Sequence, residues 1–281
     1  MDVEGKELSL EEKEKKLCEI ITALGKVAVA FSGGVDSSYL LAMCIDVLGS
    51  ENVLALTADS PLLPREELQR ARHVAESLGA RHKVVPFDEL RIPQVVANVP
   101  KRCYYCKKAR FQALWEITKA ELPGSQLVHG ENADDQKDYR PGSQAARELG
   151  VRAPLLEAGL SKQEIRELSR RRGLPTWSLP AAACLATRFP YGVRLTLEGL
   201  RRVEQGEKFL RRVLGVALLR LRDHFPIARL ELSSDQLERV VANSALRREV
   251  VQGLRALGYR YITLDLEGYR MGSMNVGLER F

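Results

Sequence analysis

The stretch VAVAFSGGVDSSYLLAMC, residues 27–44, sets the fold of the first half of the chain. An apolar run ends at Gly33 and Gly34, and the residues after them have the spacing of a helix. Glycines between a buried strand and a helix let backbone N–H groups approach a ligand that a Cβ would exclude. The helix N-terminus adds its dipole and free N–H groups. The stretch therefore predicts an anion site, with a tight turn lacking a ligand as the alternative.

Polar side chains surround the two glycines. The hydroxyls of Ser32, Ser37 and Ser38 can donate hydrogen bonds to a phosphate, whereas the carboxylate of Asp36 would be repelled by one. We therefore expect a magnesium ion between Asp36 and the phosphate. The stretch contains neither G-x-x-x-x-G-K-[ST] nor G-x-G-x-x-G, which excludes the two commonest nucleotide-binding loops.

Strand and helix patterns alternate through the first part of the chain. After a charged helix at 8–23, the predicted elements are strand 26–31, helix 37–49, strand 52–57, helix 65–79, strand 82–87, helix 107–120, strand 125–130 and helix 161–173. The last helix opens with a capping pattern, Ser161-x-x-Glu164. Strands that alternate with helices imply right-handed crossovers and a parallel sheet covered on both faces. The fold class is therefore α/β.

The element order changes after about residue 190. A long helix precedes two strands around a proline-containing turn, two short helices and a last strand, and the helix and three strands are expected at 196–215, 216–223, 227–232 and 259–266. This order predicts an α/β domain over residues 1–189 and a smaller α+β domain over 190–281. The proline-rich stretch LPAAACLATRFPYG, residues 179–192, is the expected linker region.

The composition is that of a soluble globular protein, with 45% hydrophobic and 28% charged residues among 281. We find no apolar run long enough to span a membrane, and the charged N-terminus does not resemble a secretory signal, so a cytoplasmic location is expected. The net charge of +6 suits anionic ligands such as nucleotides. Aromatic residues do not alternate with the basic segments, so stacking platforms for single-stranded nucleic acid are not evident.

Three of the five cysteines lie in unusual surroundings. Cys103 and Cys106 form a C-x-x-C pair flanked by four basic residues, which favour thiolates, and Cys184 lies among small residues close to Arg188. Zinc would need a fourth nitrogen or sulfur ligand, and the four histidines show no ligand spacing around the pair. Three thiolates without an obvious fourth ligand suit a [4Fe-4S] cluster with one open iron. Three unrelated reduced thiols are the alternative.

The segment SGGVDS, residues 32–37, resembles the PP-loop of the adenine-nucleotide α-hydrolase superfamily. Members of that superfamily cleave ATP between the α and β phosphates and use ammonia, amines or sulfur as the nucleophile. The resemblance implies an ATP pyrophosphatase domain over residues 1–189, whose loop holds the pyrophosphate part of ATP. The residues that it assigns to the nucleotide are Ser32, Gly33, Gly34, Asp36, Ser37 and Ser38, with Thr57, Ala58 and Gly130 at the ends of neighbouring strands.

Six further segments resemble the LarE family. They are RCYYCK, HGENADDQKDYRPG, GLPTW, PAAACLATRFPYG, ARLEL and DLEGYRMGSMN, and the resemblance runs from about residue 10 to the C-terminus. LarE enzymes are ATP-dependent sulfurtransferases for pyridinium-3,5-biscarboxylic acid mononucleotide, in the biosynthesis of the nickel-pincer nucleotide cofactor of lactate racemase. The resemblance implies that ATP adenylates a pyridinium carboxylate and that a sulfur nucleophile then displaces AMP. Two turnovers would give the two thiocarboxylates.

The family resemblance also assigns the cysteines. In one branch a single cysteine, matching Cys184, gives up its own sulfur. In another branch two further cysteines complete a [4Fe-4S] site whose open iron carries a sulfide for transfer. Because this chain has the pair Cys103 and Cys106, we expect the second branch, with all three cysteines as cluster ligands. The implied cofactors are the [4Fe-4S] cluster, ATP and Mg²⁺. A sulfide source and a homo-oligomer, with a hexamer as one option, are the implied partners.

Further roles follow partly from the resemblance and partly from local chemistry. Arg220 and Arg222 alternate on a predicted strand and match positions expected to hold the substrate phosphate, with exposed strand charges as the alternative. Lys101 and Arg102 are predicted to stabilise the charge of the acyl phosphate beside the catalytic Cys184. Three loop carboxylates, Asp134, Asp135 and Asp138, are expected near magnesium, with solvated loop acids as the alternative. Glu231 is expected at a metal site in a subunit contact.

Three other functions compete with this one. A tRNA-thiolating PP-loop enzyme would also use cysteine pairs, and the basic pI of about 9.1 favours it, but no appended RNA-binding module is evident. An amidating enzyme of the NAD-synthetase type would need no cysteines. A binding protein without enzymatic activity would leave the PP-loop unexplained.

Overall fold

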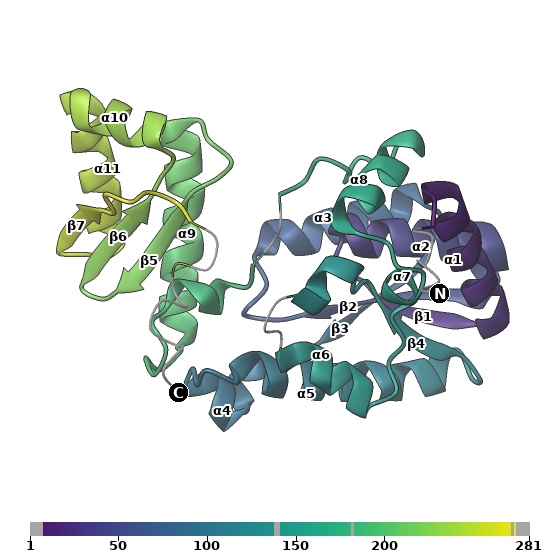
Figure 1. Cartoon of the computed structure of the whole chain (residues 1–281). Helices are drawn as coiled ribbons and strands as arrows, with labels where there is room; N and C mark the ends of the chain where they lie inside the picture. The colour runs from purple at the N-terminus through teal and green to yellow at the C-terminus, as the bar shows by residue number, and fades with distance from the viewer. Residues whose placement is uncertain (1–7, 138–140, 181–182, 271–272, 274–281) are drawn as a thin grey trace, which may run out of the picture. The chain divides into compact units, whose positions relative to one another are not determined.

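The computed structural model describes residues 8–137, 141–180, 183–270 and 273 (Figure 1). The chain divides into two compact units. The first unit contains Met1–Ser60, Arg65–Asp88 and Cys103–Ala182, and the second contains Pro61–Pro64, Glu89–Arg102 and Ala183–Phe281. The second unit therefore takes two short segments from the first half of the sequence. The domain boundary expected at residue 189 remains a prediction.

The first unit is built on a four-stranded parallel sheet, as the sequence predicts. Its strands are β1 (Val27–Ala30), β2 (Val53–Asp59), β3 (Arg81–Pro86) and β4 (Gln126–His129), in the order β3-β2-β1-β4. Val27 of the central strand β1 pairs with Val53 on one side and Gln126 on the other. The carboxyl ends of β1 and β4 therefore lie side by side, where a parallel α/β sheet places its ligands.

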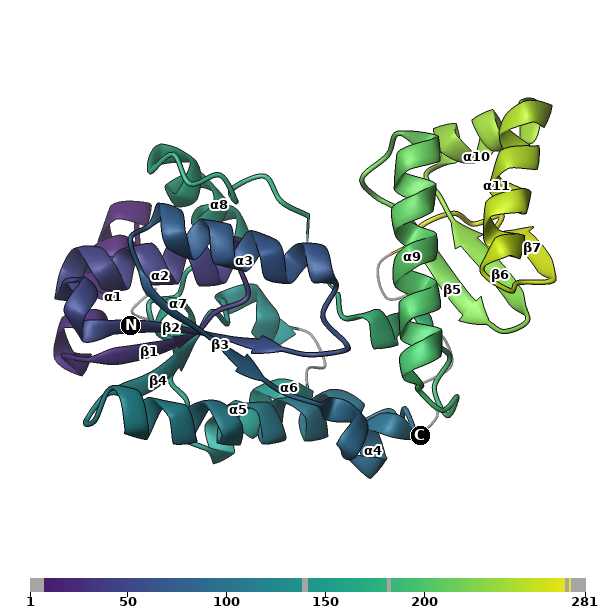
Figure 2. The same ribbon diagram turned by 180° about the vertical axis from the view of Figure 1, so that it is seen from behind.

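Helices cover both faces of this sheet (Figures 1 and 2). One face carries α1 (Leu10–Leu24), α2 (Val35–Leu48), α3 (Arg65–Ser77) and α8 (Lys162–Arg171), and the other carries α5 (Arg102–Glu121) and α6 (Pro141–Glu148). The strands supply both cores because successive side chains point to opposite faces. Val27 and Val29 belong to the core under α2, and Ala28 belongs to the core that contains Phe111 of α5.

Short helical segments connect these elements. They are η1 (Ser50–Asn52), η3 (Ala133–Lys137) and α7 (Pro154–Glu157) in the first unit, and η2 (Glu89–Arg91), α4 (Pro93–Val96) and η4 (Leu185–Arg188) in the second. Both capping boxes of the described helices, at Ser9–Glu12 and Ser161–Glu164, have the reciprocal hydrogen bonds of that motif. The second one was predicted from the sequence, and it fixes where α8 begins.

The second unit is an α+β structure around a smaller mixed sheet. Its elements are α9 (Leu197–Leu214), β5 (Arg220–His224), β6 (Ile227–Glu231), α10 (Ser234–Ala242), α11 (Ser244–Ala256) and β7 (Tyr261–Leu264). Strand β6 pairs antiparallel with β5 and parallel with β7. A separate core, which includes Leu210, Leu230 and Leu254, holds α9 and α11 against the sheet. No helix in the described part of the chain is long and apolar enough to cross a membrane.

Candidate functional site

The turn between β1 and α2 has the geometry that the two glycines predict. Gly33 has φ +69°, and a Cβ at this position would lie 2.7 Å from the Cα of Ala71 on α3. Gly34 is the N-cap residue of α2 and makes no side-chain capping bond, so the N-terminus of this 14-residue helix keeps N–H groups for a ligand. The backbone of the turn therefore forms a cradle for an anion at the carboxyl end of β1.

The serine hydroxyls of the turn form a small network. The Oγ atoms of Ser32 and Ser37 lie 3.0 Å apart, and Ser37 Oγ also donates to the carbonyl of Gly34 at 3.3 Å. Ser38 is buried, and its Oγ has no hydrogen-bond partner among the described residues. These hydroxyls are ordered within the turn and retain capacity to bind phosphate oxygens.

Asp36, the carboxylate of the turn, is bound by a residue that the sequence analysis did not select. Its Oδ2 lies 2.6 Å from Nζ of Lys162, the first residue of α8. Burial raises the pKa of Asp36, and Lys162 opposes that shift. The second oxygen, Oδ1, is buried without a hydrogen-bond partner among the described residues. A carboxylate oxygen in this state fits a hard cation such as Mg²⁺.

The acidic loop after β4 supports the same region. Asp134 Oδ2 accepts a hydrogen bond of 2.9 Å from the backbone N–H of Lys162, and Asp135 Oδ2 accepts one of 3.1 Å from Asn132. The charge of Asp135 is one of the causes that raise the pKa of Asp36, after burial. Asp134 therefore orders the start of α8. Asp138 lies outside the described residues.

Gly130 and Thr57 lie at the ends of neighbouring strands of the sheet. A Cβ on Gly130 would lie 2.9 Å from the backbone nitrogen of Ser37, so the chain after β4 presses against the start of α2. The Thr57 hydroxyl is buried, donates to the carbonyl of Phe31 at 2.8 Å and lies 2.8 Å from Nε2 of His82. Thr57 thus joins the strands, and the half-buried Ala58 follows it. The contact of Thr57, Ala58 and Gly130 with the nucleotide remains a prediction.

The three cysteines selected from the sequence differ in exposure. Cys103 is exposed and Cys106 half-buried on the first turns of α5, where Arg110 Nη2 lies 3.5 Å from Cys106 Sγ. Cys184 is half-buried and precedes η4. The first two belong to one unit and the third to the other. Within the described residues, no three His, Cys, Asp or Glu side chains are grouped as metal ligands, and the shared site of these cysteines remains a prediction.

The two residues predicted to act beside Cys184 differ in their surroundings. Lys101 is exposed, whereas the Arg102 side chain is buried and donates to the carbonyl of Ala186 at 3.1 Å and to Asn98 Oδ1. The backbone around Cys184 is further held by Arg188, whose Nη1 donates to the carbonyls of Ala183 and Cys184 at 2.7 and 3.1 Å.

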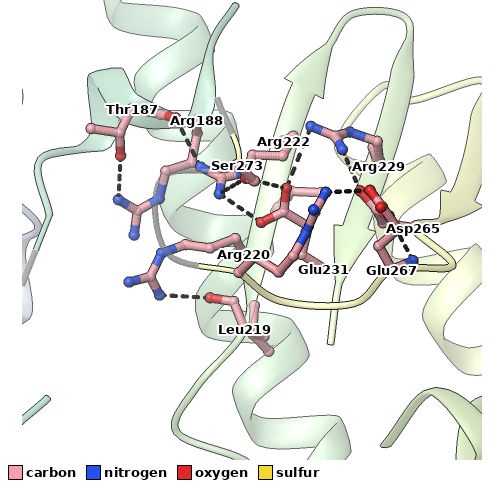
Figure 3. Close-up of polar contacts among 12 residues, drawn as sticks. Thr187, Arg188, Leu219, Arg220, Arg222, Arg229, Glu231, Asp265, Glu267 and Ser273 are labelled. Atoms are coloured by element: carbon pink, nitrogen blue, oxygen red, sulfur yellow. Dashed lines mark hydrogen bonds and ion pairs between the residues drawn. The ribbon is translucent and has the colours of Figure 1, made fainter. Parts of the chain in front are cut away.

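Arg220 and Arg222 lie on one face of β5, as their alternation predicts (Figure 3). Both are buried, so the alternative of solvent-exposed strand charges is wrong. Arg222 forms an ion pair of 2.6 Å with the fully buried Glu231 of β6 and donates to the carbonyl of Thr187 at 2.9 Å. Glu231 also lies 3.4 Å from Arg229, so its carboxylate is shared by two guanidinium groups.

Arg220 has a different set of partners. Its Nη1 donates to the carbonyl of Leu219 at 2.8 Å, and its guanidinium lies 5.1 Å from the centre of the Tyr269 ring. Among the described residues it forms no ion pair, and burial and the charge of Arg188 lower its pKa. Arg188 itself is neutralised by Glu207, with bonds of 2.9 and 3.0 Å. The charge of Glu207 opposes this shift in the pKa of Arg220, but a buried guanidinium that has no ion pair among the described residues still suits an anionic ligand.

A glycine turn of this geometry, at the carboxyl end of the first strand of a parallel sheet, places the protein in the PP-loop class of ATP-using enzymes. The sequence profile of the NAD synthase family matches residues 11–104, which contain the turn. This match contains the glycine turn and ends at residue 104, so it does not reach Cys106, Cys184 or the part of the second unit from residue 183 onward.

Full-length relatives define the family more closely. The chain is 39% identical to pyridinium-3,5-bisthiocarboxylic acid mononucleotide synthase of Lactiplantibacillus plantarum, over 95% of each chain. It is 42% identical to the uncharacterized protein slr1717 of Synechocystis, over 95% of this chain and 98% of that one. It is 28% identical to the uncharacterized protein MJ0830 of Methanocaldococcus jannaschii, over 87% and 91%. The chain belongs to the LarE family of PP-loop enzymes.

Proposed function

We propose that this protein is an ATP-dependent sulfurtransferase that converts both carboxylates of pyridinium-3,5-biscarboxylic acid mononucleotide to thiocarboxylates, in the biosynthesis of the nickel-pincer nucleotide. The observation that carries the proposal is the near full-length similarity to the Lactiplantibacillus plantarum synthase, in a chain whose PP-loop has the cradle geometry. A carboxylate oxygen cannot leave at neutral pH, whereas an acyl phosphate can, so ATP is needed to activate the carbonyl.

The first step assigns roles to the residues around the PP-loop. A carboxylate oxygen of the substrate attacks the α-phosphorus of ATP, and pyrophosphate leaves. The N-terminus of α2, the serine hydroxyls and Lys162 would hold the pyrophosphate, because all of these groups are donors or positive charges at one end of the sheet. Asp36 would hold Mg²⁺, which supplies positive charge against the phosphates.

The substrate's own phosphate needs a second anion site. Arg220 is the candidate, because it is buried and has no ion pair among the described residues. Arg222 is predicted to assist, although its guanidinium is bound to Glu231 and Thr187 in this structure. Paired guanidinium groups suit the oxygens of a phosphate.

The second step requires sulfur. A sulfur nucleophile attacks the acyl-adenylate carbonyl, the C–O bond to AMP breaks, and a thiocarboxylate forms. Cys103 and Cys106 are three residues apart on one helix, so they are neighbours on its surface. Together with Cys184 they would supply the three thiolates that a [4Fe-4S] cluster with one open iron requires. Such a cluster, when bound, supplies an iron without a protein thiolate that can carry an external sulfide. The alternative is that Cys184 gives up its own sulfur.

Metal analysis combined with activity tests the proposal. Anaerobically purified protein should contain about four irons per chain, and the substitution Cys103→Ala should remove them, whereas Cys18→Ala, at a half-buried cysteine of α1, should not. Wild-type protein should release AMP and pyrophosphate only when the pyridinium dicarboxylate is present. Iron-free protein that still thiolates would leave Cys184 as a sacrificial donor. Absence of substrate-dependent pyrophosphate release, with retention of tRNA, would instead indicate tRNA thiolation.

A further inference from the structure

The loop that carries Cys184 has little regular structure, yet its carbonyls are bound by buried guanidinium groups. Arg188 binds the carbonyls of Ala183 and Cys184, Arg102 that of Ala186 and Arg222 that of Thr187. All three arginines are at most 4% exposed. A buried carbonyl without a helix or strand partner costs free energy unless a donor reaches it, and the guanidinium carries five donors.

Arg102 differs from the other two arginines in its position in the chain. It immediately precedes Cys103, and it belongs to the segment Glu89–Arg102 that packs within the second unit. Its guanidinium is oriented by Asn98, whose Oδ1 accepts from Nη1, and it lies 5.5 Å from the centre of the Tyr191 ring. A guanidinium with these protein partners and 3% exposure is not presented to a ligand.

Asn98 extends the same network. Its Nδ2 donates to the carbonyls of Phe189 and Pro190, at 3.4 and 2.7 Å, and its backbone carbonyl accepts from Gly192 at 3.0 Å. Asn98 has φ +50°, a left-handed conformation that asparagine tolerates better than most residues. The N–H of Leu195 also bonds to the carbonyl of Val96 at 2.8 Å. One short segment thus holds the chain from residue 186 to residue 195.

We infer that Arg102, oriented by Asn98, is a positioning residue that fixes the Cys184 loop for sulfur transfer and does not itself contact the reacting groups. The inference rests on the proposed sulfur-transfer function. It replaces the prediction that Arg102 stabilises the acyl phosphate. The two roles separate in the two half-reactions: a group on the acyl phosphate affects adenylation, whereas a group that positions the sulfur-bearing loop affects only the transfer that follows.

The test compares Arg102→Met, Arg102→Lys and Asn98→Gly with the wild type. Glycine at position 98 removes the side-chain bonds and accepts φ +50° without strain. The control is Lys119→Ala, which removes an exposed ion pair with Glu116 on the same helix α5. Three readouts are taken: substrate-dependent ATP–pyrophosphate exchange, thiocarboxylate formed per chain, and hydrogen exchange of the amides of Leu185, Gly192 and Leu195.

In Arg102→Met, pyrophosphate exchange should stay within about threefold of wild type while sulfur transfer falls about 100-fold, the cost of a misplacement on the order of 1 Å. The three amides should exchange faster. Asn98→Gly should show the same changes. The sulfur-transfer rate of Arg102→Lys should lie between those of the wild type and Arg102→Met, because lysine keeps the positive charge but loses the planar guanidinium fork. The control should match wild type in all three readouts.

Three outcomes would overturn the inference. A parallel loss of both half-reactions with unchanged amide exchange would place Arg102 on the acyl phosphate. Unchanged sulfur transfer in Arg102→Met would remove any role in positioning. If the wild type adenylates no pyridinium dicarboxylate, the proposed function fails. Amide exchange alone then decides whether Arg102 and Asn98 hold the loop. Unchanged amide exchange in both Arg102→Met and Asn98→Gly would show that the loop is held without these two side chains.

Discussion

The carboxylate of Asp36 has two oxygens in different states. One is bound to Lys162, and the other is buried without a partner among the described residues. A buried carboxylate in this state is costly, and the cost falls when a cation binds. Lys162 therefore offsets the charge of Asp36 in this structure. In the proposed function it would also offer a positive charge to the phosphates of the nucleotide.

Removal of Lys162 should change the pH dependence of adenylation. Burial raises the pKa of Asp36, and Lys162 is the main group that opposes this shift, so Lys162→Met should raise the pKa further. Asp36 must be ionised to hold Mg²⁺. The acidic limb of the pH–rate profile of ATP–pyrophosphate exchange should therefore move to higher pH. Loss of a charge-assisted bond worth about 1.5–3 kcal/mol should also lower the exchange rate about 10- to 100-fold.

The conservative variant provides the control for this prediction. Lys162→Arg keeps the positive charge beside Asp36, so its acidic limb should stay close to that of the wild type even if its rate falls. Both profiles are measured as substrate-dependent exchange across the range from acidic to mildly alkaline pH. An unshifted limb in Lys162→Met would mean that Lys162 does not control the ionisation of Asp36.

At the scale of elements, the end of β4 packs closely against the start of α2, beside the glycine turn. Gly130→Ala would put a Cβ 2.9 Å from the backbone nitrogen of Ser37 and 3.1 Å from the carbonyl carbon of Asp36. Because these atoms belong to the backbone, α2 must move, and ATP affinity should fall by about tenfold or more, which corresponds to about 1.4 kcal/mol. Binding of ATP by calorimetry checks this prediction.

A second glycine variant provides a control that distinguishes the loss of close packing from a general loss of stability. Gly79 follows α3 and has φ +62°, and a Cβ added there would have no described atom within 4 Å apart from its chain neighbours. Gly79→Ala should therefore cost about 1 kcal/mol of stability through its backbone conformation and leave ATP affinity unchanged. Equal affinity in Gly130→Ala and Gly79→Ala would contradict the packing argument.

At the scale of the whole molecule, two parts of the second unit differ in how they depend on distant sequence. The core of α9, α11 and β5–β7 lies entirely within residues 210–259, apart from partly buried neighbours on either side. The loop from residue 185 to 195 instead bonds to Leu62, Val96 and Asn98, which come from the first half of the chain. A fragment 183–281 should therefore fold its helices and sheet but lose the ordered loop.

Hydrogen exchange of the fragment tests this dependence. Amides of β5 and β6 should remain protected, as in the full chain, because both strands of that pair are present. The amides of Leu185, Gly192 and Leu195 should exchange as in an open loop, because their carbonyl acceptors are missing. Protection of these three amides in the fragment would show that the loop folds without the first half of the chain.

Features that depend on local pattern could be predicted from the amino-acid sequence. The alternation of apolar strands with amphipathic helices predicted the parallel sheet, the glycine pair located the cradle at the end of β1, and Ser161 with Glu164 marked the start of α8. The period-two spacing of Arg220 and Arg222 placed both on one face of β5. These signals act over a few residues, and backbone geometry converts them directly into structure.

Which charges meet could be learned only from the folded chain. Lys162 reaches Asp36 across 126 residues, and Arg102 reaches Ala186 across 84. No periodicity marks such a pair, because each partner has the pattern of an ordinary charged residue in its own segment. The segments 61–64 and 89–102 join the second unit for the same reason. Buried charges take the partners that packing brings within hydrogen-bond distance, and packing is a property of the whole folded chain.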